Sequence, residues 1–141
     1  MFDKTITVFN QHDGIWYPKT FTCAQAIDDR GYIRRTYGDT SSDSVSVHLP
    51  VSERDGRTYV GDVEYLDPKA WAEADKANAV TFRGGKNFDI LLRGNYDPAP
   101  IADSDYTGGF YKHLRETYDG VWAVNNVTRY YVLPHFELTG K

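Results

Sequence analysis

Side chains that could perform catalysis or bind a metal are few and scattered in this sequence. The four histidines, at positions 12, 48, 113 and 135, show none of the close spacings, such as H-x-H or H-E-x-x-H, that bring two ligands to one metal ion. His48 and His135 fall in predicted strands and could meet in space, although surface or hydrogen-bonded histidines are the simpler interpretation. We therefore predict no metal site and no cofactor.

The other reactive side chains also have simple structural interpretations. Cys23 is the single cysteine, which excludes an internal disulfide, and nothing around it indicates an activating helix N-terminus. The acidic groups Asp28-Asp29 and Asp103-Ser104-Asp105 lie in predicted turns, where such residues usually cap backbone amides. Gly84-Gly85-Lys86 has only part of a phosphate-loop pattern and lies between two predicted strands, which favours a hairpin turn. No catalytic residue is predicted, and we do not expect an enzyme.

Length and charge restrict the function classes further. The 141 residues suit one domain, which spans residues 1–141. The net charge of -4 argues against tight, sequence-independent DNA binding, because that binding depends on a basic surface that neutralises phosphates. The N-terminus has no apolar signal-peptide core, and no apolar run approaches the ~20 residues of a membrane helix, so we expect a soluble protein made in the cytoplasm.

Alternating apolar residues predict that the elements holding these side chains are mostly strands. Thr5–Phe9 alternates polar and apolar residues, and Asp13-Gly14 predicts a turn to a partner strand over 15–22. Pro18 predicts an edge or a bulge in that partner. Residues 44–49 alternate strictly, with Val45, Val47 and Leu49 on the inner face, and Pro50 is expected to end the strand.

The rest of the chain predicts further short strands and two helical pieces. A short helix is expected over 67–74, one or two helical turns over 110–118, and a terminal hairpin of 121–127 with 131–138, joined near 128–130. Further predicted strands cover 32–37, 80–82 and 88–93, with loops at 38–43 and 95–105. We predict a mainly β fold, a small antiparallel β-barrel or sandwich with one or two short helices and mobile loops at 28–43 and 95–110.

The aromatic residues predict both a core and a binding surface. Trp16, Phe82, Phe88 and Trp122 lie at alternating strand positions and are expected in the core. Tyrosine is enriched at protein interfaces because it buries a large area at low entropic cost. The loop tyrosines, together with loop arginines, therefore favour a protein-binding surface, whose candidate residues are Arg34, Arg35, Tyr37, Tyr96, Tyr106 and Tyr130.

The order of these motifs resembles a known group of proteins. The strand that begins Thr5-Ile-Thr-Val-Phe-Asn is followed by Trp16-Tyr17-Pro18, the strand at 44–50, and the strand at 87–94. The chain closes with Tyr118-Asp-Gly-Val-Trp-Ala-Val-Asn-Asn-Val-Thr and His135-Phe-Glu-Leu-Thr-Gly-Lys. This order is similar to that of an uncharacterised family of phage and prophage structural proteins from Gram-positive bacteria. More loosely, Val121 to Gly140 resembles the closing hairpin of phage head–tail joining proteins, from which residues 61–78 and 95–119 depart as insertions.

The resemblance implies a bacteriophage virion protein. It implies a head–tail connector, namely a head-closure component in the neck of the virion, which is assembled in the host cytoplasm. Its partners would be copies of itself in a ring, a portal or adaptor protein, and a tail terminator or tail tube protein, with transient contact to packaged DNA and no membrane. A tail terminator, an adaptor or a minor capsid protein are alternatives within the virion.

A small carbohydrate-binding or hydrolytic β-domain is the alternative from a different class. The pair Trp16-Tyr17 could stack on sugar rings, although core packing is the default for a tryptophan in an alternating strand.

Overall fold

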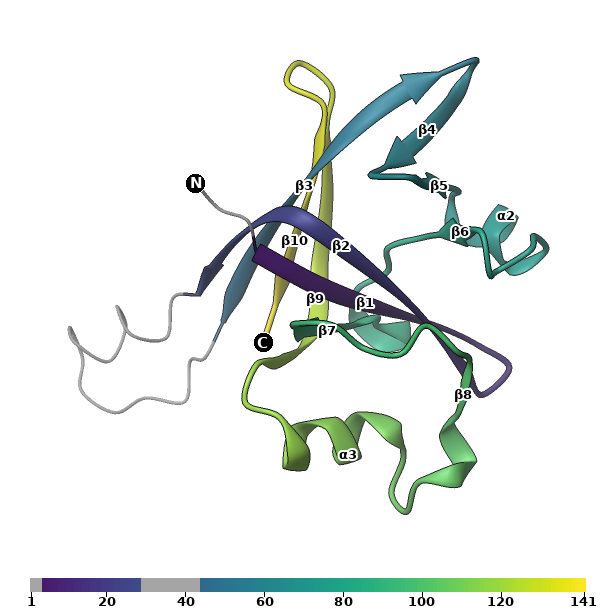
Figure 1. The fold of residues 1–141 in the computed structure, drawn as a ribbon, viewed down its shortest axis with the longest axis vertical. Coiled ribbons are helices and arrows are strands. Elements are labelled where there is room, and N and C mark those ends of the chain that lie inside the picture. Colours follow the sequence, from purple (N-terminus) through teal and green to yellow (C-terminus); the bar gives the residue numbers. More distant parts are fainter. Residues whose placement is uncertain (1–3, 29–43) are drawn as a thin grey trace.

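The computed structural model describes the backbone of residues 4–28 and 44–141, and these residues form one curled sheet with short helices beside it (Figure 1). The mainly β prediction is confirmed. The predicted strand at 32–37 and loop at 38–43 lie outside the described residues. The described strands are β1 Lys4–His12, β2 Ile15–Asp28, β3 Val45–Arg54, β4 Arg57–Val60, β5 Val63–Tyr65, β6 Ala79–Val80, β7 Ile90–Arg93, β8 Ile101–Ala102, β9 Val121–Tyr130 and β10 His135–Gly140.

Pairing of β2 with β3 gives the sheet its barrel-like curl. The strands follow one another in the order β6-β5-β4-β3-β10-β9-β7-β1-β2-β8, and almost all neighbours are antiparallel. The far end of β2 also pairs with β3, from Gln25 opposite His48 to Asp28 opposite Val45. Strands β3, β10, β9, β7, β1 and β2 therefore form a closed circuit of pairings around a common interior.

Two apolar cores share the wall formed by β1 and β7. Ile6, Val8 and Leu91 point into the barrel, where they meet Leu138 and other inward residues of the surrounding strands. The alternate residues of the same two strands, such as Phe9, Ile90 and Leu92, face a second core on the outside of the sheet. The helix α3 (Phe110–Thr117) covers this second core with Phe110 and Leu114. Strands β1 and β7 are thus buried on both faces. The alternating pattern of Thr5–Phe9 had predicted a strand with one buried and one exposed face.

The hairpin of β1 and β2 follows the predicted local chemistry. Asp13 and Gly14 both have positive φ angles, 53° and 77°, as a two-residue turn that matches the twist of the strands requires. Pro18 lies opposite Phe9, in a part of β2 that pairs with β1 alone, so its missing N–H faces no neighbouring strand. The edge position predicted from Pro18 is therefore confirmed.

Pro50 does not end its strand, contrary to the sequence prediction. The strand β3 continues to Arg54, because it changes partners at this residue. Pro50 is the last residue of β3 opposite β10, where it faces His135, and pairing with β4 begins at the next residue, Val51. A proline is tolerated at such a change because the ladder requires no donor from it.

The predicted hairpin at Gly84-Gly85 is also wrong. The short strand β6 pairs in parallel with β5, whereas β7 pairs with β1 and β9, so the two segments are not neighbours in the sheet. Between them lies a 3-10 turn, η1 (Gly85–Asn87). The backbone N–H of Asp89 donates to the carbonyl of Arg83, which closes the loop without a strand ladder.

The helical predictions are largely confirmed. Pro68 begins α2 (Pro68–Ala72), although this helix is shorter than predicted, and α3 ends one residue before the predicted limit. The segment 95–105 contains the two-residue strand β8 and the 3-10 turn η2 (Asp103–Asp105). The terminal hairpin of β9 and β10 is confirmed, but its turn lies at 131–134 rather than near 128–130.

Leucines at two positions of this terminal hairpin provide a test of the core. Leu138 is fully buried in the barrel, whereas Leu133 in the turn is 77% exposed. Leu138→Ala is expected to lower the free energy of unfolding by about 2–5 kcal/mol, through lost burial and the cavity left behind. Leu133→Ala is expected to change it by less than about 0.5 kcal/mol. Urea denaturation of both variants measures the difference. An equal loss of unfolding free energy in both would contradict the burial of Leu138 in the barrel.

Candidate protein-interaction surface

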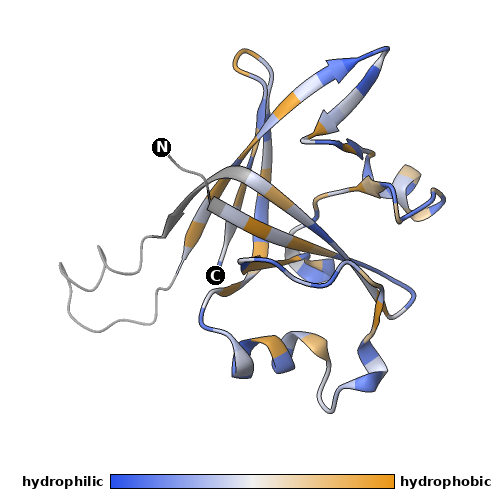
Figure 2. Ribbon diagram, viewed as in Figure 1, coloured by the Kyte–Doolittle hydropathy of each residue, from blue (hydrophilic) through white to orange (hydrophobic). Residues whose placement is uncertain are grey.

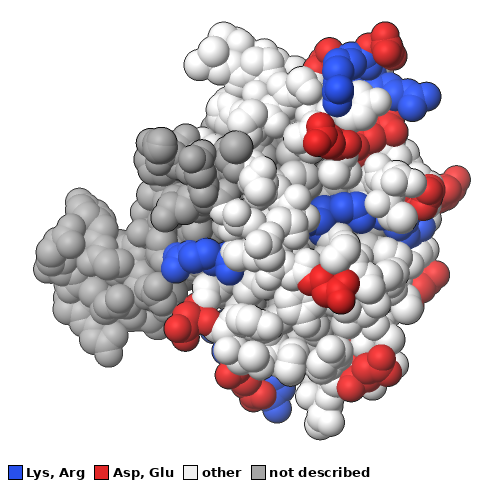
Figure 3. Space-filling view, in the orientation of Figure 1, with Lys and Arg blue, Asp and Glu red and all other residues white. Residues whose placement is uncertain are grey.

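The most exposed apolar surface of the described residues is the turn between β9 and β10. We call Tyr130–Pro134 the hairpin tip. Its side chains are exposed to 43% at Tyr130, 70% at Tyr131, 94% at Val132 and 77% at Leu133. The tip projects beyond the barrel as an apolar loop (Figures 1 and 2). Figure 3 shows that its surface carries no charged group, while the neighbouring β3–β4 turn carries both signs. An exposed apolar patch with a polar border is typical of a protein-binding site.

Aromatic stacking holds one side of the hairpin tip. On the outer face of the sheet, the ring of Tyr130 stacks on His135 at 4.6 Å between centroids, and His135 stacks on His48 at 5.4 Å. The Nδ1–H of His135 donates to the carbonyl of Leu133, 2.7 Å away, since a carbonyl oxygen can only accept. His48 and His135, whose predicted strands left a meeting in space open, do lie together, and their stack connects the tip to β3.

A carboxylate completes this outer cluster. Glu137 accepts hydrogen bonds from the hydroxyls of Ser46 and Tyr130, at 3.1 and 3.2 Å, and lies 3.3 Å from His48 Nε2. The hydrogen bond from its hydroxyl to this carboxylate, and then the charge of the carboxylate, raise the pKa of Tyr130, because both favour the neutral phenol. Among the described residues, no group of three potential metal ligands comes together.

An arginine holds the other side of the tip. Arg129 lies over the ring of Tyr131 at 4.8 Å and over Phe136 at 5.4 Å. Its guanidinium group also pairs with Glu53 on β3, at 3.2 Å. The tip is therefore anchored from both faces of the hairpin, which lowers the conformational entropy that it would lose on binding.

The other predicted interface residues are placed differently. Tyr96 and Tyr106 are half-buried, with ring centroids 5.8 and 5.1 Å from that of Phe110, so they contribute to the second core. Arg34, Arg35 and Tyr37 lie outside the described residues. Val132 and Leu133 were not among the predicted interface residues, because 131–138 was predicted to be a strand. Pro134 could have indicated that the strand begins later, because proline disfavours the interior of a strand and β10 begins at the next residue, His135.

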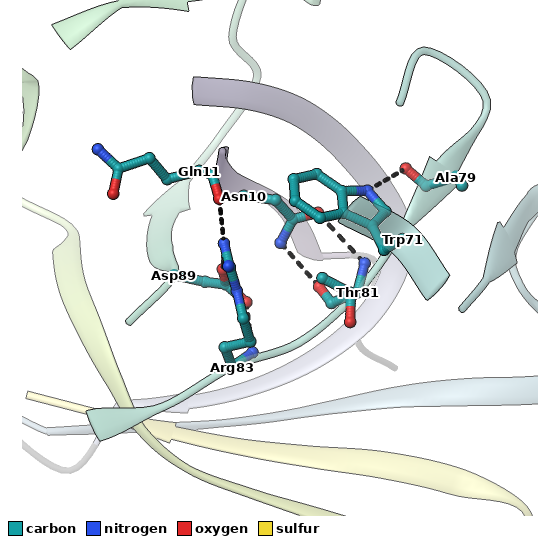
Figure 4. Close-up of polar contacts among 7 residues, drawn as sticks. All are labelled: Asn10, Gln11, Trp71, Ala79, Thr81, Arg83 and Asp89. Carbon is teal, nitrogen blue, oxygen red and sulfur yellow. Dashed lines mark hydrogen bonds and ion pairs between the residues drawn. The ribbon is translucent and has the colours of Figure 1, made fainter. Parts of the chain in front are cut away.

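A buried polar cluster beside the barrel is the second notable group (Figure 4). The carboxylate of Asp89 is fully buried, accepts a hydrogen bond from the backbone N–H of Arg83, and lies 3.4 Å from the Arg83 guanidinium group. That guanidinium group also donates to the carbonyl of Gln11 at 2.6 Å and lies over the ring of Trp71. Burial raises the pKa of Asp89 to about 7, against the opposing effect of Arg83.

The rest of this cluster joins two segments that are distant in the sequence. The side-chain amide of Asn10 donates to the carbonyl of Thr81 and accepts from its N–H, at 2.7 and 3.2 Å. Asn10 pairs with β2 on one side, and these two bonds serve its other side, where the pairing of β1 with β7 has ended at Phe9. The cluster fixes the loop after β6 to β1, which is a structural role.

Asp103 also has a structural role. Its Oδ1 accepts hydrogen bonds from Trp16 Nε1 at 2.9 Å and from the backbone N–H of Phe110, the first residue of α3, at 2.8 Å. The expected capping of backbone amides by this acidic group is confirmed. Trp16 is 4% exposed, so its ring is unavailable for stacking on a sugar.

These features define a small barrel-like β protein that presents an anchored apolar hairpin tip. The chain belongs to a family of unknown function, DUF6751, whose family model matches residues 1–141. Searches of curated proteins and of solved structures found no match. Among the described residues, no helix is long and apolar enough to cross a membrane.

The buried carboxylate leads to a prediction about pH. Because the pKa of Asp89 is about 7 in the folded protein and near 4 in an unfolded chain, the folded state holds an extra proton between these values. The contribution of Asp89 to stability is therefore greatest below about pH 4, decreases as the pH rises to about 7, and is constant above. Asp89→Asn removes the titrating group and should flatten this part of the stability profile.

Urea denaturation across this pH range measures the effect. Asp105→Asn is the matched control, because Asp105 is exposed on η2 and the same change there leaves the buried carboxyl intact. An identical slope in wild type and in Asp89→Asn would show that Asp89 ionises in the folded protein as it does in the unfolded chain.

Proposed function

We propose that this chain is an assembly protein that binds another protein through the hairpin tip. The observation that carries the proposal is the exposure of Tyr131, Val132 and Leu133 on an anchored turn. Burial of apolar surface is the dominant favourable contribution to most protein–protein association, and nearby charged groups provide specificity. An isolated apolar residue on a surface needs no explanation, but consecutive ones at the end of a projecting hairpin do.

The anchoring supports a specific role for the tip. The stack of Tyr130, His135 and His48 and the packing of Arg129 give the tip a defined conformation before any partner binds. A turn that served only to join two strands would need neither apolar side chains nor contacts on both faces. Polar turn residues such as Asp13-Gly14 perform that task in the first hairpin.

The proposed setting is a bacteriophage particle. The likeness of the sequence to phage structural proteins supports it, with the chain as a head–tail connector in the neck that contacts a portal or adaptor protein, tail proteins and further copies of itself. A tail terminator, an adaptor or a minor capsid protein would use the same tip in a different position. A barrel with a projecting hairpin suits all of these roles, since each requires a rigid body and an adhesive extension.

The double substitution Val132→Asp and Leu133→Asp tests this function. In the phage or prophage that encodes the chain, the gene is deleted and the protein is supplied from a plasmid. The double variant should be incorporated into purified particles at least about tenfold less than wild type, because its charges would be buried without partners. Quantitative immunoblotting of gradient-purified particles, together with the infectious titre, measures the loss.

Ala99→Asp provides the matched control, because it adds a charge at an exposed loop residue away from the tip. Both proteins should keep the urea midpoint of wild type, as expected for exposed positions. Normal incorporation of the double variant would contradict the role of the tip, and absence of the wild-type chain from purified particles would contradict the phage setting.

A further inference from the structure

An apolar pocket opens at the same end of the molecule as the hairpin tip. Its floor is formed by the buried side chains of Phe21, Leu49 and Val60, and its volume is about 330 Å³. The residues at its wall and rim are Thr20, Thr22, Pro50, Gly61, Asp62 and Val63. The pocket therefore exposes part of the barrel interior between β2 and the turn that joins β4 to β5.

The pocket lies beside the base of the hairpin tip. Pro50 at its wall faces His135 across the β3–β10 ladder, and the N–H of Val51 donates to the carbonyl of Pro134 at 3.1 Å. An apolar projection and an apolar recess are thus one strand apart. Each has apolar surface exposed to water, and the tip could cover the apolar surface of the pocket.

The sizes of the two features agree. The side chains of Val132 and Leu133 contain three and four carbon groups, each close to the ~30 Å³ that a water molecule takes up. Together they need roughly 200 Å³, which the pocket of about 330 Å³ accommodates. The bulkier ring of Tyr131 can remain at the rim, over the exposed residues Thr22 and Asp62.

The surrounding charges also suit a copy of the same surface. The β3–β4 turn beside the tip carries two acidic and two basic side chains, Glu53, Arg54, Asp55 and Arg57. A surface that carries a single sign of charge would repel its own copy, whereas one of mixed sign can face itself. Figure 3 shows both signs together on this turn.

We infer that the pocket of one copy of this chain receives the hairpin tip of a second copy. Because tip and pocket lie at one end, two copies related by a two-fold axis can each insert a tip into the other, as in an isologous interface. This inference rests on the proposed function of the tip and names its partner. A ring of this chain would then be built from such pairs and would need additional contacts.

Cysteine cross-linking between two different variants tests the contact. Both carry Cys23→Ser; one also carries Val132→Cys in the tip and the other Asp62→Cys at the pocket rim, with different affinity tags. Under mild oxidation, the mixed disulfide of these two should form at least about fivefold faster than that between Val132→Cys and Glu116→Cys, an exposed position on α3. Equal rates for both pairs would overturn the inference.

A second measurement does not depend on cysteine. Thr22→Trp places a large ring at the pocket rim from an exposed position and should weaken self-association at least about tenfold, as measured by analytical ultracentrifugation. Thr117→Trp changes another exposed threonine, at the end of α3, and should associate as wild type does. A wild-type chain that remains monomeric at high concentration, or equal association of both variants, would overturn the inference.

The two proposals fail in different ways. If the aspartate variants of the tip lose incorporation into particles but Thr22→Trp keeps it and wild type does not self-associate, the tip binds a different protein. The proposed function then stands and the paired arrangement is wrong. If the aspartate variants are incorporated normally, the tip has no role in assembly, whatever the cross-linking shows.

Discussion

Four residue pairs between β2 and β3, from Gln25 opposite His48 to Asp28 opposite Val45, join the two sides of the curled sheet. The inward residues of β3 and β10, such as Val47 and Leu138, are fully buried because the closed circuit of strands surrounds them. The antiparallel pairing of β3 with β10 places the later part of β3 beside the start of β10, with Pro50 opposite His135. It therefore brings the β3–β4 turn and the hairpin tip to one end of the molecule.

The sequence predicted those features of the fold that depend on short segments. Alternation in residues 44–49 identified the buried face of β3, and the Asp13-Gly14 pair identified the turn between β1 and β2, because pleat and turn geometry act over only a few residues. It failed where an element depends on distant neighbours. Whether Pro50 ends a strand is decided by which strand lies beside it, and the loop from β6 to β7 is closed by the hydrogen bonds between Asp89 and Arg83.

The candidate surface was predicted only in part, for the same reason. Tyr130 was identified as an interface residue and lies in the exposed tip, whereas Tyr96 and Tyr106, chosen on the same grounds, pack against α3. Residue type and loop position do not distinguish these cases, since a loop that folds over an apolar face buries its aromatic rings. Asp89 in an otherwise apolar strand was a visible sign of a buried polar partner, and the chain supplies it in Arg83.

The two end strands of the sheet offer little to a partner that would bind by adding a strand. The strands at the two ends of the sheet, β6 and β8, have two residues each, which is too short to offer a ladder to an added strand. Recognition by strand addition is therefore disfavoured at these edges. Among the described residues, the large apolar side chains that remain most exposed are those of the hairpin tip, in the turn between β9 and β10. Binding through the tip then depends on the shape and polarity of a recess in the partner. A few substitutions in the tip or in that recess can therefore change the affinity and the choice of partner.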